Sequence, residues 1–151
     1  MQPKKQLLFI DASSYIYRAF HAIPYLSNSK GQPTNAIYGF IQMLIKVIKD
    51  FKTDHIAVAF DVKGPSFRHK MYEQYKAHRP EMPDNLKPQI PYIKEFVRAF
   101  NIPVLELEGY EADDIIGTIS KQMKEKDVEV IIIAADKDML QLIDDNITIV
   151  D

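Results

Sequence analysis

The chain has 151 residues, of which 46% are hydrophobic and 26% charged, with a formal net charge of −2. These values are ordinary for one soluble globular domain with its own core. The absence of cysteine excludes disulfides and thiolate metal sites and suits a reducing cytoplasm, and we expect neither a signal peptide nor a membrane-spanning segment.

The first element is an apolar strand over residues 7–10 that ends in Asp11. A strand-to-helix turn, Ala12-Ser13-Ser14, follows and opens a helix. Within this helix, Tyr17 and Arg18 place an aromatic ring beside a cation, a combination that can stack a nucleobase and hold a phosphate. The alternative is that Tyr17 is a core residue, as tyrosines at helical spacing often are.

Residues 24–35 are rich in Pro, Ser, Asn and Gly and predict a loop. Apolar side chains then recur every three or four positions over residues 37–48 and predict a second helix. The next apolar run, residues 56–60, is a strand that ends in Asp61. A strand, a helix and a second strand in this order predict a parallel sheet in an α/β fold.

Residues 63–91 interrupt this pattern with interleaved basic and aromatic side chains, followed by a Pro-rich part with Pro80, Pro83, Pro88 and Pro91. The interleaving suits a single nucleic-acid strand, because cations can follow the phosphates while rings stack on bases. The prolines predict a mobile excursion from the sheet, although a merely solvated loop is the alternative. The candidate contact residues in this segment are Arg68, Tyr75, Lys76 and Arg79.

A third helix at about residues 92–100 and a short strand within 102–107 lead to the acidic motif GYEADD at 109–114. A helical pattern begins at Ile115, so Glu111, Asp113 and Asp114 fall in a first helical turn, where acids also serve simply as caps. A buried strand over residues 128–135 then ends in Asp136, and a last strand covers 147–150.

Three predicted strands therefore each end in an aspartate. Ligands bind outside the carboxyl ends of the strands in open parallel sheets, so these acids should meet in one pocket that a hard cation, Mg²⁺ or Mn²⁺, makes tolerable. Two cations about 4 Å apart would activate water and stabilise a leaving phosphodiester oxygen. The candidate metal ligands are Asp11, Asp61, Glu111, Asp113, Asp114, Asp136 and Asp138.

Charge is also unevenly distributed: the first 103 residues carry a net +7 and the last 48 a net −9. A basic surface beside an acidic pocket suits an enzyme that acts on a polyanion, and solvated helix faces are the alternative. Lys76 and Arg79 are candidates for stabilising charge on a scissile phosphate. No Gly-rich phosphate loop and no Ser-His-Asp or Cys-His arrangement is evident.

The spaced motifs resemble the 5′-nuclease domain of bacterial DNA polymerase I, in the flap-endonuclease group of PIN-like nucleases. They are FID at 9–11, FD at 60–61, SFR at 66–68, YKAHRP at 75–80, GYEADD at 109–114 and ADKD at 135–138. The resemblance implies a three-layer, Rossmann-like domain and a cytoplasmic, structure-specific 5′→3′ exonuclease and flap endonuclease acting on flapped or nicked DNA and on RNA primers. It assigns metal binding to the seven acids, stacking near the cleaved junction to Tyr17, and a place in the arch around the 5′ strand to Lys76 and Arg79.

The family also has further aspartates for the second metal and a helix-three-turn-helix module, both expected downstream of residue 151. We therefore expect a domain over residues 1–151 that is weak or inactive alone. Rival interpretations are a PIN-type ribonuclease acting on single-stranded RNA and a non-catalytic nucleic-acid-binding module. A haloacid-type phosphatase would need a second aspartate where Ser13 stands.

Overall fold

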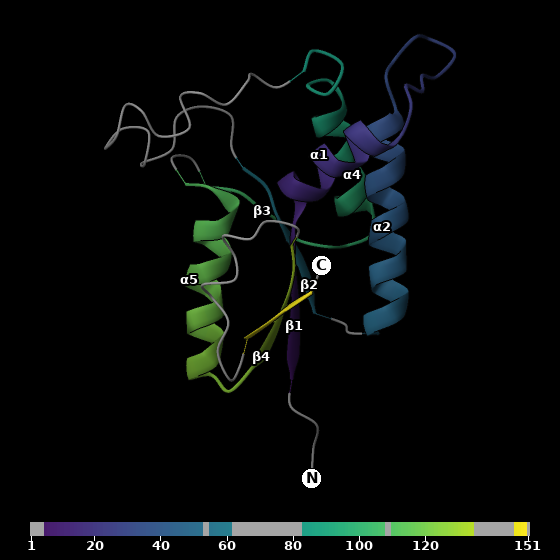
Figure 1. Cartoon of the computed structure of the whole chain (residues 1–151). Coiled ribbons are helices and arrows are strands. Elements are labelled where there is room, and N and C mark those ends of the chain that lie inside the picture. Colours follow the sequence, from purple (N-terminus) through teal and green to yellow (C-terminus); the bar gives the residue numbers. More distant parts are fainter. Residues whose placement is uncertain (1–4, 53–54, 62–82, 108–109, 135–146, 151) are drawn as a thin grey trace.

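The computed structural model describes residues 5–52, 55–61, 83–107, 110–134 and 147–150 (Figure 1). The side chain of Asp113 is outside this description. The strands are β1 (Gln6–Asp11), β2 (Ile56–Ala59), β3 (Val104–Leu105), β4 (Glu129–Ile133) and β5 (Ile147–Val150). The helices are α1 (Ala12–Ala22), α2 (Asn35–Phe51), α4 (Gln89–Ala99) and α5 (Ala112–Glu125). No helix in these ranges is long and apolar enough to cross a membrane.

The described strands form one five-stranded sheet in the order β3-β2-β1-β4-β5, and every recorded pairing is parallel. The central strand is β1, where Asp11 pairs with Ala59 of β2 and Ile10 with Ile133 of β4. The carboxyl ends of three strands therefore lie side by side at one edge. The predicted α/β class with a mainly parallel sheet is confirmed.

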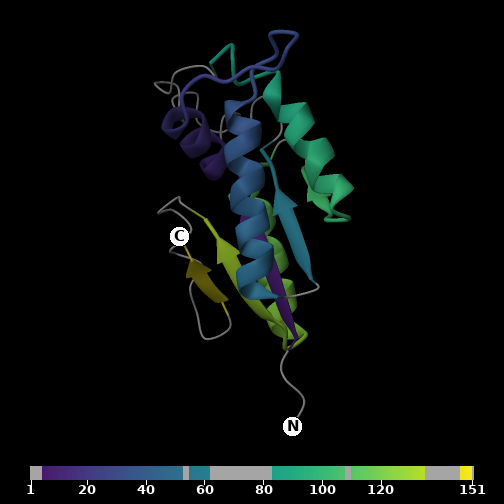
Figure 2. The same ribbon diagram turned by 90° about the vertical axis from the view of Figure 1, so that its right-hand side faces the viewer.

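Helices cover both faces of the sheet and make three layers (Figures 1 and 2). Alternate side chains of β1 face opposite layers, as the period of a strand requires. Leu8 and Ile10 belong to the core under α1, α2 and α4, whereas Phe9 belongs to the core under α5. A strand buried on both faces explains why this part of the sequence is continuously apolar.

The structure differs from the prediction of a mobile segment over residues 63–91 in the last part of that segment. Residues 62–82 are outside the described ranges, but 83–91 form a turn and the start of α4, with Leu86 and Gln89 fully buried. The prolines misled the sequence interpretation because Pro88 and Pro91 lie at the helix start. There the missing N–H removes no intrahelical hydrogen bond.

A buried amide pair connects three helices beneath this turn. The Gln89 Oε1 atom accepts hydrogen bonds from the backbone N–H groups of Ala36 (2.8 Å) and Ile37 (3.0 Å) at the start of α2. Gln89 Nε2 donates to Asn35 Oδ1 at 2.9 Å, and Asn35 Nδ2 donates to the carbonyl of Phe20 at 3.0 Å near the end of α1. The pair thus holds α1, the helix that follows Asp11, against α2 and α4.

Candidate active site

The acidic edge of the sheet is formed where β1 and β2 end and α5 begins. Asp11 is the last residue of β1, and Asp61 follows β2 by two positions. Glu111 occupies the N-cap of α5, and Asp114 lies in its first turn. These four described acids come from three segments that are far apart in the sequence.

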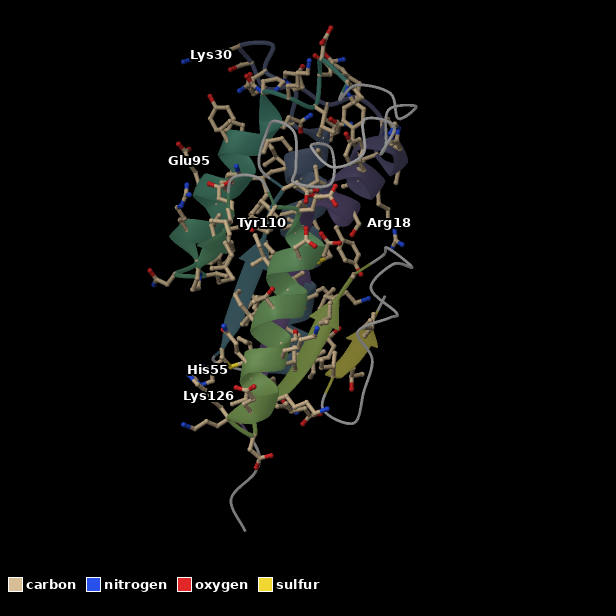
Figure 3. All side chains as sticks on the ribbon, turned by 90° about the vertical axis from the view of Figure 1, so that its left-hand side faces the viewer. Arg18, Lys30, His55, Glu95, Tyr110 and Lys126 are labelled. Atoms are coloured by element: carbon tan, nitrogen blue, oxygen red, sulfur yellow. The ribbon has the colours of Figure 1, made fainter. Side chains whose placement is uncertain are left out.

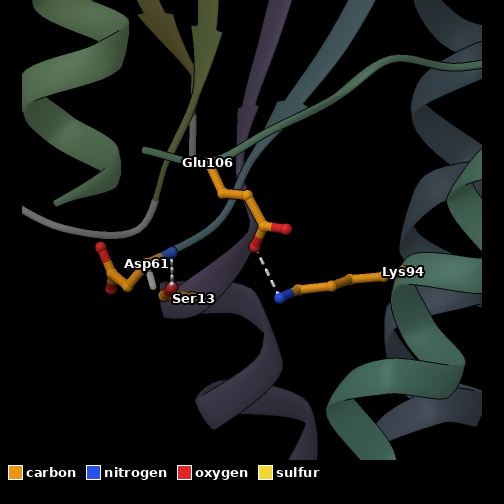
Figure 4. Close-up of polar contacts among 4 residues, drawn as sticks. All are labelled: Ser13, Asp61, Lys94 and Glu106. Carbon is orange, nitrogen blue, oxygen red and sulfur yellow. Dashed lines mark hydrogen bonds and ion pairs between the residues drawn. The ribbon is translucent and has the colours of Figure 1, made fainter. Parts of the chain in front are cut away.

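One hydrogen bond connects two of these segments directly. Asp61 Oδ1 accepts from the backbone N–H of Ala112 at 2.6 Å, which brings the Asp61 carboxylate next to the Glu111–Ala112 peptide. The backbone N–H of Asp61 donates to Ser13 Oγ at 3.4 Å (Figure 4). Asp61 is therefore held between the start of α1 and the start of α5.

Asp11 is the most deeply placed of the described acids, with 5% of its surface exposed. The Ser14 hydroxyl donates to Asp11 Oδ2 at 3.4 Å and is 3.3 Å from the backbone carbonyl of the same residue. Burying a carboxylate is costly unless hydrogen bonds or a cation compensate the charge. An aspartate buried at the carboxyl end of the central strand is thus a natural position for a cation ligand.

The start of α5 also uses its acids as caps. Asp114 Oδ2 accepts a hydrogen bond from the backbone N–H of Glu111 at 3.1 Å, which satisfies one donor at the helix start. Within the described ranges, no group of three or more His, Cys, Asp or Glu side chains is arranged to hold a metal ion. This statement does not cover three of the seven predicted ligands, since Asp136, Asp138 and the Asp113 side chain lie outside the described residues.

The predicted nucleic-acid contacts are described only on α1. Tyr17 is 37% exposed and is therefore not a core residue, and Arg18 is exposed with its guanidinium carbon 5.2 Å from the Tyr15 ring centroid. Figure 3 shows Arg18 and Tyr110 on opposite sides of the first turn of α5. The remaining predicted contacts lie outside the described residues: Arg68, Tyr75, Lys76 and Arg79.

An ion pair that the sequence did not reveal borders the acidic edge. Lys94 Nζ of α4 is 2.7 Å from Glu106 Oε2 and 5.4 Å from the centroid of the Phe60 ring (Figure 4). The pair is partly exposed, and it connects α4 to the segment that follows β3. No local sequence pattern relates positions 94 and 106. They meet because α4 packs beside β3.

A groove of about 430 Å³ lies beside the start of α5. Its walls include Leu105, Tyr110, Asp114 and Ile115. Tyr110 and Leu107 are 45% and 55% exposed, so the acidic edge has an apolar border on this side.

Comparisons with known proteins show the family of this chain. Residues 6–151 match the family model described as "5′-3′ exonuclease, N-terminal resolvase-like domain". A DNA polymerase I of Caldicellulosiruptor bescii is 49% identical over 144 residues, which are 95% of this chain and 17% of the relative. A 5′-3′ exonuclease of Aquifex aeolicus is 47% identical over 146 residues, which are 97% of this chain and 50% of the relative. The chain thus spans between about a sixth and a half of these relatives.

Among solved structures, the T5 D15 protein co-crystallised with metal ions superposes with a TM-score of 0.71 at 23% identity. The match covers 96% of this chain and 54% of that chain. A second T5 D15 flap endonuclease structure, a pseudo-enzyme-product complex with DNA and metal ions, gives a TM-score of 0.70. At this level of identity the likeness establishes a common fold.

Proposed function

Because this chain belongs to the family of N-terminal, resolvase-like domains of 5′-3′ exonucleases, we propose that it contains the active site of a metal-dependent 5′→3′ exonuclease and 5′-flap endonuclease. Its substrate is DNA with a 5′ flap or a nick, and RNA primers, during replication and repair in the bacterial cytoplasm. The observation that carries the proposal is the match of residues 6–151 to the 5′-3′ exonuclease family model, and the adjacent parallel strands that lead to Asp11 and Asp61 agree with it.

The donor chemistry at this edge supports a hard divalent cation. Asp11, Asp61 and Glu111 offer carboxylate oxygens, the ligands that Mg²⁺ and Mn²⁺ prefer. We assign the metal site to these acids together with Asp113, Asp114, Asp136 and Asp138, and we expect two ions in the complete enzyme. A bound cation supplies Lewis acidity for phosphodiester hydrolysis. T5 proteins of the same fold have been crystallised with metal ions, which supports a metal-dependent reaction here.

The chain's own side chains then orient the substrate. Lys76 and Arg79 stabilise negative charge on the scissile phosphate, as charged donors do in phosphoryl chemistry. Tyr17 stacks on a base near the cleaved junction, and Arg18 holds a neighbouring phosphate. Arg68 and Tyr75 contact the single strand that carries the 5′ end.

Asp113→Ala and Asp136→Ala test the assignment in a chain extended through the downstream module. Each variant should lose Mg²⁺-dependent cleavage of a 5′-flapped DNA by at least about a hundredfold, since a metal ligand is removed. Asp50→Ala, at an exposed position near the end of α2, is a control that should cleave normally. Faster cleavage of single-stranded RNA than of flapped DNA by the unsubstituted enzyme would instead identify a PIN-type ribonuclease.

One observation favours a second candidate, a non-catalytic nucleic-acid-binding module. Asp61 and Asp114 both accept hydrogen bonds from backbone N–H groups at the start of α5, as caps do. If the acids of this chain only cap helices, any cleavage by the extended protein comes from another part of it, and Asp113→Ala and Asp136→Ala should leave that cleavage unchanged. The alanine variants therefore separate the two candidates.

We also propose that residues 1–151 hold the first metal site, while further aspartates and a DNA-gripping helix-three-turn-helix module lie in the rest of the full enzyme. The limited share of each relative that the chain spans supports this division. The isolated 151 residues should therefore cleave flapped DNA weakly or not at all in Mg²⁺. Cleavage at the rate of the extended chain would contradict this division.

A further inference from the structure

The exposed side of α1 carries two aromatic rings rather than one. The ring centroids of Tyr17 and His21 are 6.4 Å apart, and their planes differ by 20°. The residues are four positions apart, so they lie on the same face of the helix, one turn from each other. Both side chains are exposed, and the sequence analysis assigned a function only to Tyr17.

The His21 ring also contacts a neighbouring aromatic ring, that of Phe20. Its ring meets the Phe20 ring edge-on, with centroids 5.2 Å apart and planes at 81°. Phe20 is partly buried and packs against the hydrophobic core. The imidazole thus has a supported orientation, which lowers the entropy lost when another ring stacks on it.

We propose that Tyr17 and His21 form a two-ring platform on which nucleobases of one DNA strand stack, so that His21 is a DNA-binding residue. The inference rests on the proposed nuclease function, because it places the platform on the helix that starts beside Asp11. With a rise of about 1.5 Å per residue, Tyr17 lies about 9 Å and His21 about 15 Å along α1 from Asp11. A strand whose phosphate lies at the acidic edge can therefore reach both rings within a few nucleotides.

The distance between the two rings and the nearby Arg18 cation are both consistent with the stacking of a DNA strand. A separation of 6.4 Å between the rings is close to two steps of a stacked strand, at about 3.4 Å per step. Arg18 projects from the same exposed stretch of α1 and supplies a cation for the backbone of that strand. Stacking on rings is tolerant of base identity, which suits an enzyme that recognises the shape of its DNA.

The experiment measures binding of a 5′-flapped DNA, with 2-aminopurine near the junction, to the chain extended through the downstream module, in Ca²⁺ instead of Mg²⁺. His21→Gln removes the ring and His21→Phe keeps one, while Tyr38→Gln removes an exposed ring on α2 as a control. His21→Gln should weaken binding roughly 5- to 150-fold, the effect of losing one stacked base, and should reduce quenching of 2-aminopurine. His21→Phe should stay within about threefold of the unsubstituted chain, and Tyr38→Gln should have no effect.

Two results would overturn the platform while leaving the nuclease proposal intact. One is unchanged binding by His21→Gln, which would make the ring pair a helix-stabilising contact only. The other is an equal loss in His21→Phe and His21→Gln, which would show that the ring surface is not what the DNA uses. If the unsubstituted extended chain neither binds nor cleaves flapped DNA, both proposals are wrong.

Discussion

Asp61 Oδ1 accepts a hydrogen bond of 2.6 Å from the backbone N–H of Ala112, 51 positions away in the sequence. The bond joins the carboxyl end of β2 to the first turn of α5, where backbone N–H groups have no partner within the helix. The Asp61 carboxylate thus has two separable properties, an acceptor oxygen for the helix and a negative charge for the proposed metal site.

Substituting Asp61 separates these properties. Asp61→Asn keeps an acceptor, so the free energy of unfolding should fall by less than about 1 kcal/mol, whereas Asp61→Ala loses the cap and should cost about 1–2 kcal/mol. Both variants lack the charge, so both should bind Mn²⁺ at least about tenfold more weakly. Urea denaturation and Mn²⁺ titration measure the two effects. Unchanged Mn²⁺ affinity in Asp61→Asn would remove Asp61 from the metal site.

Gln89 should be among the most sensitive buried positions. Gln89→Met keeps the length and packing of the side chain but leaves the N–H groups of Ala36 and Ile37 without their acceptor. The free energy of unfolding should fall by about 2–4 kcal/mol, because buried donors would lose their partners. Gln42→Met, at an exposed position of α2, is the matched control and should change stability by less than about 0.5 kcal/mol. A small effect of Gln89→Met would mean that water replaces the amide.

Gly39 is required by the close approach of α1 and α2. A Cβ atom at this position would lie 2.6 Å from Ala19 Cβ and 2.6 Å from Ile23 Cδ1. Gly39→Ala should therefore cost about 1–3 kcal/mol through overpacking, although alanine is the better helix former by about 1 kcal/mol. Adding Ala19→Gly should recover part of the loss in a double-mutant cycle. Stabilisation by Gly39→Ala alone would show that the helices separate without cost.

Ser120 offers a substitution that should stabilise the protein. Its side chain is fully buried in α5, and its hydroxyl has no hydrogen-bond partner within the described structure. Ser120→Ala removes the unsatisfied hydroxyl and improves helix propensity, so the free energy of unfolding should rise by about 1 kcal/mol or more. The exposed Thr118→Ala, also in α5, reports the contribution of propensity alone. A loss of stability in Ser120→Ala would reveal a partner for the hydroxyl.

Much of the architecture follows from local patterns. The apolar runs that end at Asp11 and Asp61 are strands, the pattern after Ile115 is α5, and residues 147–150 form β5 as expected. The prediction was less accurate around Gln89, where prolines concealed the start of α4. A proline at a helix start and a proline in a loop look alike in sequence, since the two differ only in what the following turn packs against.

Sequence periodicity determined the strands and most of each helix, and parallel pairing then places the carboxyl ends of β1, β2 and β4 at one edge of the sheet. Tertiary structure alone decided that Asp61 caps α5, that Gln89 caps α2 and that Lys94 pairs with Glu106. Each of these contacts joins groups from different elements. Their formation depends on how closely helices pack on the sheet and on one another, a distance that no local pattern of residues encodes.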